Sequence, residues 1–128
     1  MTDRQSTVLI IEDDRFLRRA AQAGLAQEGF QVFAAAEGHE GLRSAAEIKP
    51  DVILLDLLMP GMSGIDVLKA LKADELTRGI PVMILSNSSR DQDKQQAEAL
   101  GAVGYFIKAN LSLADLARTI ERLLEGGA

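Results

Sequence analysis

The chain has 128 residues, which suits one ordinary globular domain and is too short for two well-cored ones. Hydrophobic residues make up 47% of it and charged residues 26%, a balance that excludes a disordered or fibrous protein. The net charge of −5 argues against general binding to nucleic acids or anionic membranes, and the absence of cysteine excludes disulfides, thiolate catalysis and cysteine-bound metals.

Five short apolar segments alternate with longer segments of helical periodicity. Each apolar segment is only 4–5 residues long and consists mostly of β-branched or bulky side chains. The strongest segments show no alternation of polar and apolar residues, which is typical of strands buried on both faces of a parallel sheet. We therefore expect strands at residues 8–11, 31–35, 51–55, 81–85 and 104–107.

The intervening segments are predicted to be amphipathic helices. The last one carries an apolar stripe that runs from Leu113 through Leu116 and Ile120 to Leu124, with a period of about 3.6 residues. The segment at 89–101 has apolar residues only in its last turn, so we expect a helix that packs weakly on the sheet. Capping residues delimit the helices, with N-caps at Asp14, Ser63 and Ser112 and left-handed C-caps at Gly29 and Gly101.

Strands that alternate with helices indicate an α/β fold. Five β–α units predict a five-stranded parallel sheet, doubly wound as (βα)5, with right-handed crossovers and helices on both faces. No repeat, linker or low-complexity tract divides the chain, so we expect a single domain over residues 1–128 with its core at about 7–125. No apolar run approaches the ~20 residues of a membrane span. Residues 1–7 are polar and contain no signal peptide, so we expect a cytoplasmic protein.

Charged and hydroxyl side chains follow the predicted strands at their carboxyl ends, where open parallel sheets bind ligands. Glu12 and Asp13 follow the first strand, Asp56 the third, Ser86 the fourth and Lys108 the fifth. Each residue alone is common as a turn former, a cap or a solvated side chain, but chance placement of all of them at one edge is improbable. The sequence therefore predicts a functional site there. We interpret His39, at a helix start that we expect to lie away from this edge, as a surface residue.

The charges of these residues indicate a cation site. Glu12, Asp13 and Asp56 carry a formal charge of −3 and Lys108 carries +1, which leaves −2. Such a cluster is unfavourable at short range, and a divalent cation would balance it. All candidate ligands are hard oxygens, which suit Mg²⁺, with Mn²⁺ as the other possibility.

A cation beside a carboxylate favours phosphoryl transfer, because an aspartate can attack phosphorus while a metal and a lysine neutralise the transferring oxygens. Asp56 is the best candidate nucleophile because it ends the central strand. A hydroxyl from Ser86 could bond a further oxygen. The turn-rich loop at 59–64 would leave the backbone carbonyl of Leu58 free to bind the metal.

Three segments resemble one protein family. They are VLIIEDD at 8–14, DVILLDLLMPGMSG at 51–64 and GYFIK at 104–108. In these segments the chain resembles the CheY-like receiver domains of two-component response regulators, over essentially its whole length. The resemblance implies the strand order 2-1-3-4-5. It implies that Asp56 is the phosphoacceptor, that Asp13 and the carbonyl of Leu58 bind Mg²⁺ with Glu12 as acidic companion, that Lys108 pairs with the phosphate, and that Ser86 and Tyr105 are the switch residues.

The resemblance also implies what the protein does. It would be a phosphorylation-activated signalling switch that receives its phosphoryl group from a histidine kinase or a histidine phosphotransfer protein. It would act on a downstream protein effector through residues 88–100, Tyr105 and the last helix, without direct contact to nucleic acid or membrane. It would be a monomer or a weak phosphorylation-dependent dimer, and an enzyme only toward its own phosphorylation and dephosphorylation. A receiver domain of a larger regulator and a phosphorelay intermediate are alternatives within the same class.

One position departs from the family pattern, and two other classes of protein fit these residues less well. The family's lysine usually precedes a proline in a cis peptide, whereas Ala109 follows Lys108 here, and a cis bond to alanine would cost roughly 2.5–4 kcal/mol. An aspartate-nucleophile phosphatase of the haloacid-dehalogenase type would need an acid where Leu58 stands. A flavodoxin-like flavin protein would need a phosphate-binding loop after the first strand, where residues 13–16 read DDRF.

Overall fold

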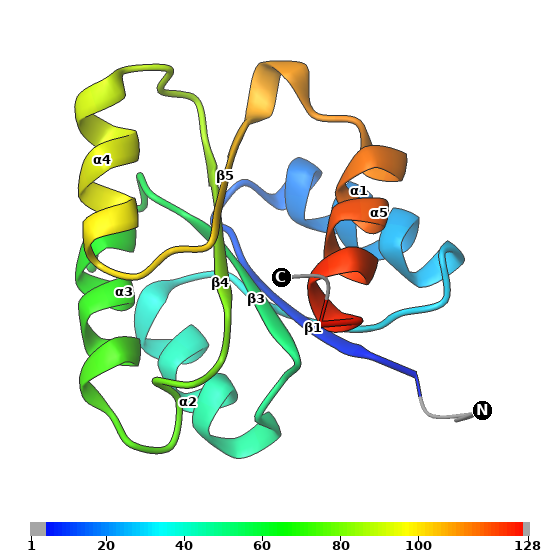
Figure 1. The fold of residues 1–128 in the computed structure, drawn as a ribbon, viewed down its shortest axis with the longest axis horizontal. Helices are drawn as coiled ribbons and strands as arrows, with labels where there is room; N and C mark the ends of the chain where they lie inside the picture. Colours follow the sequence, from blue (N-terminus) through cyan, green and yellow to red (C-terminus); the bar gives the residue numbers. More distant parts are fainter. Residues whose placement is uncertain (1–4, 127–128) are drawn as a thin grey trace.

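Strands and helices alternate along the chain in the computed structural model, which describes residues 5–126 (Figure 1). The strands are β1 (Thr7–Ile11), β2 (Gln31–Ala35), β3 (Val52–Asp56), β4 (Val82–Ser86) and β5 (Gly104–Ile107). The helices are α1 (Arg15–Gln27), α2 (Gly38–Ile48), α3 (Gly64–Ala73), α4 (Asp91–Ala99) and α5 (Leu113–Leu124), with a short 3₁₀ helix, η1 (Lys108–Asn110), before α5.

The sheet has the predicted architecture. All strand pairs are parallel, and the order is β2-β1-β3-β4-β5, so β3 is central. Every residue of β3 and of β4 is buried, which explains why these two segments are apolar without alternation. Both strands extend one residue beyond the predicted end. Asp56 is paired with Leu85 in the ladder, and Ser86 with Ile107.

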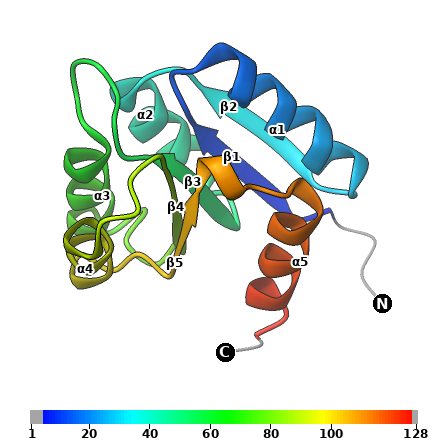
Figure 2. The same cartoon turned by 90° about the horizontal axis from the view of Figure 1, so that it is seen from above.

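Helices cover both faces of the sheet (Figure 2). On one face α1 and α5 bury alternate residues of the strands, such as Ile10 and Leu54. On the other face α2, α3 and α4 bury the residues between them, such as Ile11 and Leu55. The result is a doubly wound α/β fold with two apolar layers. No helix in the described part of the chain is long and apolar enough to cross a membrane.

The predicted helix caps are present. The side chains of Asp14, Ser63 and Ser112 each accept a hydrogen bond from the backbone N–H three residues later. Gly29 and Gly101 have φ values of 99° and 102°, the left-handed conformation that suits glycine at a helix end.

Helix α4 is shorter than expected. The prediction placed it at about 89–101, whereas it begins at Asp91 and ends at Ala99. Ser88 and Arg90 form a turn instead, because the Ser88 hydroxyl accepts from the backbone N–H of Arg90. Only Ala97 of this helix is buried, which agrees with the expectation of weak packing.

The segment after Lys108 differs from the family pattern. The Lys108–Ala109 peptide bond is trans, as are all peptide bonds among the described residues. Lys108 opens the 3₁₀ turn η1, which connects β5 to α5. A trans peptide and a tight turn thus stand where the family usually has a cis proline, and this turn lies at the upper edge of Figure 1.

Candidate functional site

Three carboxylates meet at the carboxyl ends of the neighbouring strands β1 and β3. Glu12 and Asp13 directly follow β1, and Asp56 is the last residue of β3. One oxygen from each residue lies within 4.8 Å of the others. Glu12 and Asp56 are buried, with 0% and 2% of their surface exposed, whereas Asp13 is exposed. The cluster is thus a buried acidic pair with one side open to solvent.

Lys108 is the one cation that forms ion pairs with these carboxylates among the described residues. Its Nζ lies 2.8 Å from Glu12 Oε1 and 3.2 Å from Asp56 Oδ1. Burial lowers the pKa of Lys108, but its close contact with Glu12 and the charges of Asp56 and Glu12 outweigh this effect, so that the pKa is raised. Lys108 is therefore a stable ammonium that points at the carboxylates.

Burial and neighbouring charge make Asp56 a weak acid. Desolvation, then the charge of Glu12 and the proximity of Asp13, raise the pKa of Asp56 from 3.8 to about 7, while Lys108 opposes the shift. One ammonium does not balance three carboxylates, so the cluster retains a formal charge of −2 when all three are ionised. Added positive charge would favour the ionised form of Asp56.

The donor set fits a hard divalent cation. Glu12 Oε2 is fixed by the backbone N–H of Asp14 at 3.0 Å. Glu12 Oε1 is buried and pairs with the Lys108 ammonium, but the angles of this contact lie outside hydrogen-bond geometry. Asp13, the exposed member of the cluster, gives a cation access to these oxygens from solvent. Mg²⁺ that is held by one or two carboxylates keeps its other coordination positions for water and phosphate oxygens.

The loop after β3 holds Asp56 in place. The backbone N–H of Leu58 donates to Asp56 Oδ1 at 3.1 Å, while the Leu58 side chain is 70% exposed beside the site. Its carbonyl, the expected metal ligand, belongs to the same turn. Gly64 closes the loop by donating its N–H to the Leu57 carbonyl at 2.9 Å. A Cβ at Gly64 would overlap the backbone carbonyl of Asp56, so Gly64 is a positioning residue that the sequence reasoning treated only as part of a turn.

The two expected switch residues contact a shared neighbour. The buried Ser86 Oγ accepts a hydrogen bond from the backbone N–H of Ser88 at 3.0 Å. The Tyr105 hydroxyl, on the adjacent strand β5, donates to the carbonyl of Ser88 at 2.9 Å. A groove of about 440 Å³ runs past Ser86 and Ser88 between Leu58 and α4. The sequence reasoning did not assign a role to Ser88 in this arrangement.

His39 is exposed, as expected, in the first turn of α2. The expectation that it lies away from the functional edge was wrong. Because β2 is parallel to the other strands, α2 also begins at the carboxyl edge of the sheet.

Comparisons with known proteins agree with this geometry. Residues 8–121 match the response regulator receiver domain family. The transcriptional regulatory protein PrrA of Mycobacterium tuberculosis is 38% identical over 117 residues, which cover 91% of this chain and 49% of PrrA. The chain thus spans about half the length of the curated relatives that it matches.

Solved receiver structures have the same fold over nearly the whole chain. The chemotaxis protein CheY4 of Vibrio cholerae superposes with a TM-score of 0.87 at 29% identity, covering 93% of this chain and 98% of CheY4. The receiver domain of the Francisella response regulator 1452 gives a TM-score of 0.88 at 26% identity, with 97% and 100% covered.

Proposed function

The chain belongs to the response regulator receiver domain family, and on that basis we propose that Asp56 accepts the phosphoryl group that switches it. The observation that carries the proposal is the position of Asp56. It ends the central strand, with two carboxylates within 4.8 Å and the Lys108 ammonium at 3.2 Å. Glu12 shares these neighbours, but it lies one residue beyond the end of β1, whereas Asp56 is the last residue of the central strand β3.

The proposed donor is a phosphohistidine of a histidine kinase or a histidine phosphotransfer protein. A carboxylate oxygen of Asp56 attacks phosphorus, and the phosphorus–nitrogen bond breaks. The donor imidazole leaves with the electron pair and takes up a proton, while Asp56 becomes an acyl phosphate. Lys108 stays protonated and pairs with a phosphoryl oxygen, and the Ser86 hydroxyl donates to another.

The proposed cofactor is Mg²⁺, with Mn²⁺ as a substitute. Asp13, Asp56 and the carbonyl of Leu58 would hold it, and Glu12 would orient it through water. When bound, the cation supplies positive charge to the transferring oxygens and to the acidic cluster. Asp56 must be ionised to attack, and its pKa of about 7 without metal means that nearby positive charge increases the reactive fraction at neutral pH.

The proposed downstream partner is a protein effector that binds the surface of α4, β5 and α5 in the cytoplasm. The chain is expected to act catalytically only on its own phosphorylation and dephosphorylation, and as a monomer or a weak phosphorylation-dependent dimer. Its net charge of −5 argues against direct contact with nucleic acid. A phosphatase function is disfavoured because Leu58, where that class needs an acid, has an apolar side chain.

Mass spectrometry tests the assignment of the phosphoacceptor. The wild-type protein is incubated with a small acyl phosphate, with Mg²⁺ or with chelator. We expect the added mass of one phosphoryl group only with Mg²⁺. Asp56→Asn should abolish it, whereas Asp91→Asn, at an exposed aspartate of α4, should not. Stoichiometric phosphorylation of Asp56→Asn would show that the nucleophile is another residue.

A further inference from the structure

Ser88 is the point at which three parts of the molecule meet. Its backbone N–H donates to Ser86 Oγ at 3.0 Å, and its carbonyl accepts from the Tyr105 hydroxyl at 2.9 Å. Its own hydroxyl donates to a carboxylate oxygen of Asp93, in the first turn of α4. One residue thus connects β4, β5 and α4 through three separate hydrogen bonds.

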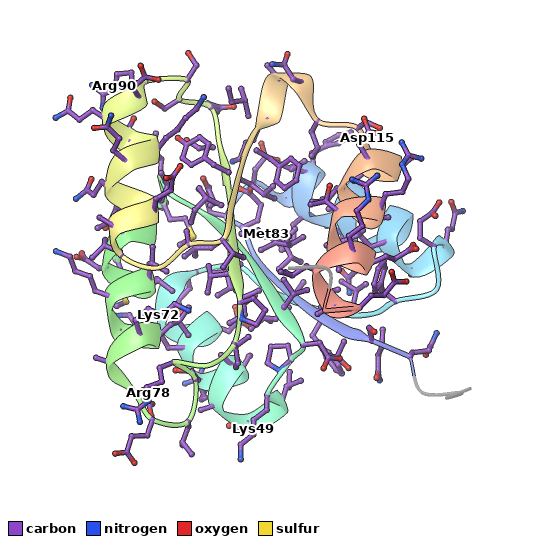
Figure 3. The ribbon with its side chains drawn as sticks, viewed as in Figure 1. Lys49, Lys72, Arg78, Met83, Arg90 and Asp115 are labelled. Atoms are coloured by element: carbon purple, nitrogen blue, oxygen red, sulfur yellow. The ribbon has the colours of Figure 1, made fainter. Side chains whose placement is uncertain are left out.

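Asp93 is itself held from a second side. Arg90 donates to it twice, from Nε and from Nη2, each at 3.1 Å. The carboxylate is only 19% exposed, whereas the Arg90 side chain is 72% exposed and lies at the start of α4 (Figure 3). The hydrogen bond from Ser88, and then those from Arg90, lower the pKa of Asp93, so it is an ionised acceptor at neutral pH.

This arrangement replaces an ordinary helix cap. The N-cap position of α4 is Arg90, which makes no side-chain capping hydrogen bond, unlike the N-caps of α1, α2, α3 and α5. The Ser88–Asp93 hydrogen bond ties the start of α4 to the β4–α4 loop instead. Because Ala97 is the only buried residue of α4, little else fixes the position of this helix.

We propose that Ser88 and Asp93 form a latch that transmits movement of Ser86 to α4 and Tyr105. The inference rests on the proposed function, in which the Ser86 hydroxyl turns toward a phosphoryl group on Asp56. Ser88 N–H must then follow its acceptor or lose it. Since Ser88 is bonded to Asp93 and Tyr105, either response moves the first turn of α4 and alters the hydrogen bond of the tyrosine hydroxyl. Ser88 and Asp93 are positioning residues, because neither would touch the phosphoryl group in this role.

The chain offers a built-in reporter for this movement. Tyr105 is its single tyrosine, and it contains no tryptophan, so intrinsic fluorescence excited in the tyrosine band reports on this residue alone. Hydrogen exchange of residues 91–99 reports independently on α4.

The experiment compares phosphorylated and unphosphorylated protein in the wild type, Ser88→Ala and Asp93→Ala. Asp91→Ala is the matched control, because it removes the other first-turn acid of α4. Ser88→Thr keeps the hydroxyl and serves as the conservative rescue. Mass spectrometry on each sample measures phosphoryl occupancy, and circular dichroism checks that each variant is folded.

At equal occupancy, we expect Ser88→Ala and Asp93→Ala to reduce the phosphorylation-dependent change in Tyr105 fluorescence and in α4 exchange at least threefold. Asp91→Ala and Ser88→Thr should retain the wild-type change. Full wild-type changes in both latch variants would overturn the proposal, as would an equal loss in Asp91→Ala. A wild type that accepts phosphate but shows no change in either signal would overturn the latch alone. Failure of the wild type to accept phosphate would instead overturn the proposed function.

Discussion

Lys108 lies closer to Glu12 than to the expected phosphoacceptor, with its Nζ 2.8 Å from Glu12 Oε1 and 3.2 Å from Asp56. The shorter of the two ion pairs of the lysine is therefore with Glu12, which is not the expected phosphoacceptor. A phosphoryl group on Asp56 would compete with Glu12 for this ammonium. Glu12 thus acts on both Lys108 and Asp56, since its charge also raises the pKa of Asp56.

Replacing Glu12 by Gln should separate these effects. The variant keeps the shape of the side chain and removes one negative charge, so the pKa of Asp56 should fall and Lys108 should pair more fully with Asp56. Mg²⁺ should bind more weakly, by on the order of tenfold for the loss of a companion of the metal ligands. Calorimetric Mg²⁺ titration measures the affinity, and carbon NMR of the carboxyl group follows the pKa. An unchanged affinity together with an unchanged pKa would contradict this account of Glu12.

The raised pKa of Asp56 predicts how stability depends on pH without metal. The folded state binds the Asp56 proton up to about pH 7, whereas the unfolded state releases it near 3.8. Between these values the folded state holds more protons, so the contribution of Asp56 to stability falls as pH rises, and the loss is complete above about pH 7. Each pKa unit corresponds to about 1.4 kcal/mol.

Urea unfolding in chelator from pH 4 to pH 8 measures this contribution. Asp56→Asn removes it, so the variant should gain stability relative to the wild type as pH rises, and should be the more stable at pH 8. Mg²⁺ should recover part of the loss in the wild type but little in the variant. A variant less stable than the wild type by more than ~1 kcal/mol at pH 8 would rule out the electrostatic strain, because that is what an ordinary destabilising substitution costs.

Most of the fold could be predicted from the sequence, because buried strands are continuous apolar runs and helices have apolar residues at a period of about 3.6. The ends of β3 and β4 were predicted one residue too early, because the last residue of each strand is polar. Asp56 and Ser86 look like loop residues, yet their backbones pair in the sheet. At α4 the reverse happens, because serine side chains satisfy backbone groups in a turn where helical residues were expected.

The acidic cluster could also be predicted, because parallel strands bring their carboxyl ends to one edge. The contribution of Gly64 could not, since it depends on how closely the start of α3 approaches the carbonyl of Asp56. The partnership of Ser88 with Asp93 and Tyr105 likewise depends on distances between elements. Such contacts leave no pattern in a single sequence.

Leu58 should slow the loss of the phosphoryl group. Hydrolysis of an acyl phosphate requires an oriented water, and the exposed side chain of Leu58 beside Asp56 offers no hydrogen bond to hold one. Leu58→Asn should therefore hydrolyse faster, by several-fold, in a decay assay followed by mass spectrometry. Leu76→Asn is the matched control, because Leu76 is a second exposed leucine outside the site, with 57% of its surface accessible. Equal decay rates in the wild type and Leu58→Asn would remove this explanation.

The two last helices should differ in how readily they open. Helix α5 buries Leu116, Ala117 and Ile120, whereas α4 buries Ala97 alone. Full burial of one leucine or isoleucine contributes about 1.5–3 kcal/mol, so α4 is docked more weakly than α5. A change of a few kcal/mol can shift such a helix between two positions. A switch element beside the expected phosphorylation site needs this property.

Native-state hydrogen exchange measures this difference directly. We expect the amides of Asp91–Ala99 to exchange at least tenfold faster than the central amides of Leu113–Leu124 in the unphosphorylated protein. Phosphorylation should change protection in α4 and around Tyr105 more than in the core of α5, because the three buried side chains of α5 hold it to the sheet in both states. Equal protection of the two helices, unaffected by phosphorylation, would show that weak packing of α4 does not serve as the moving part.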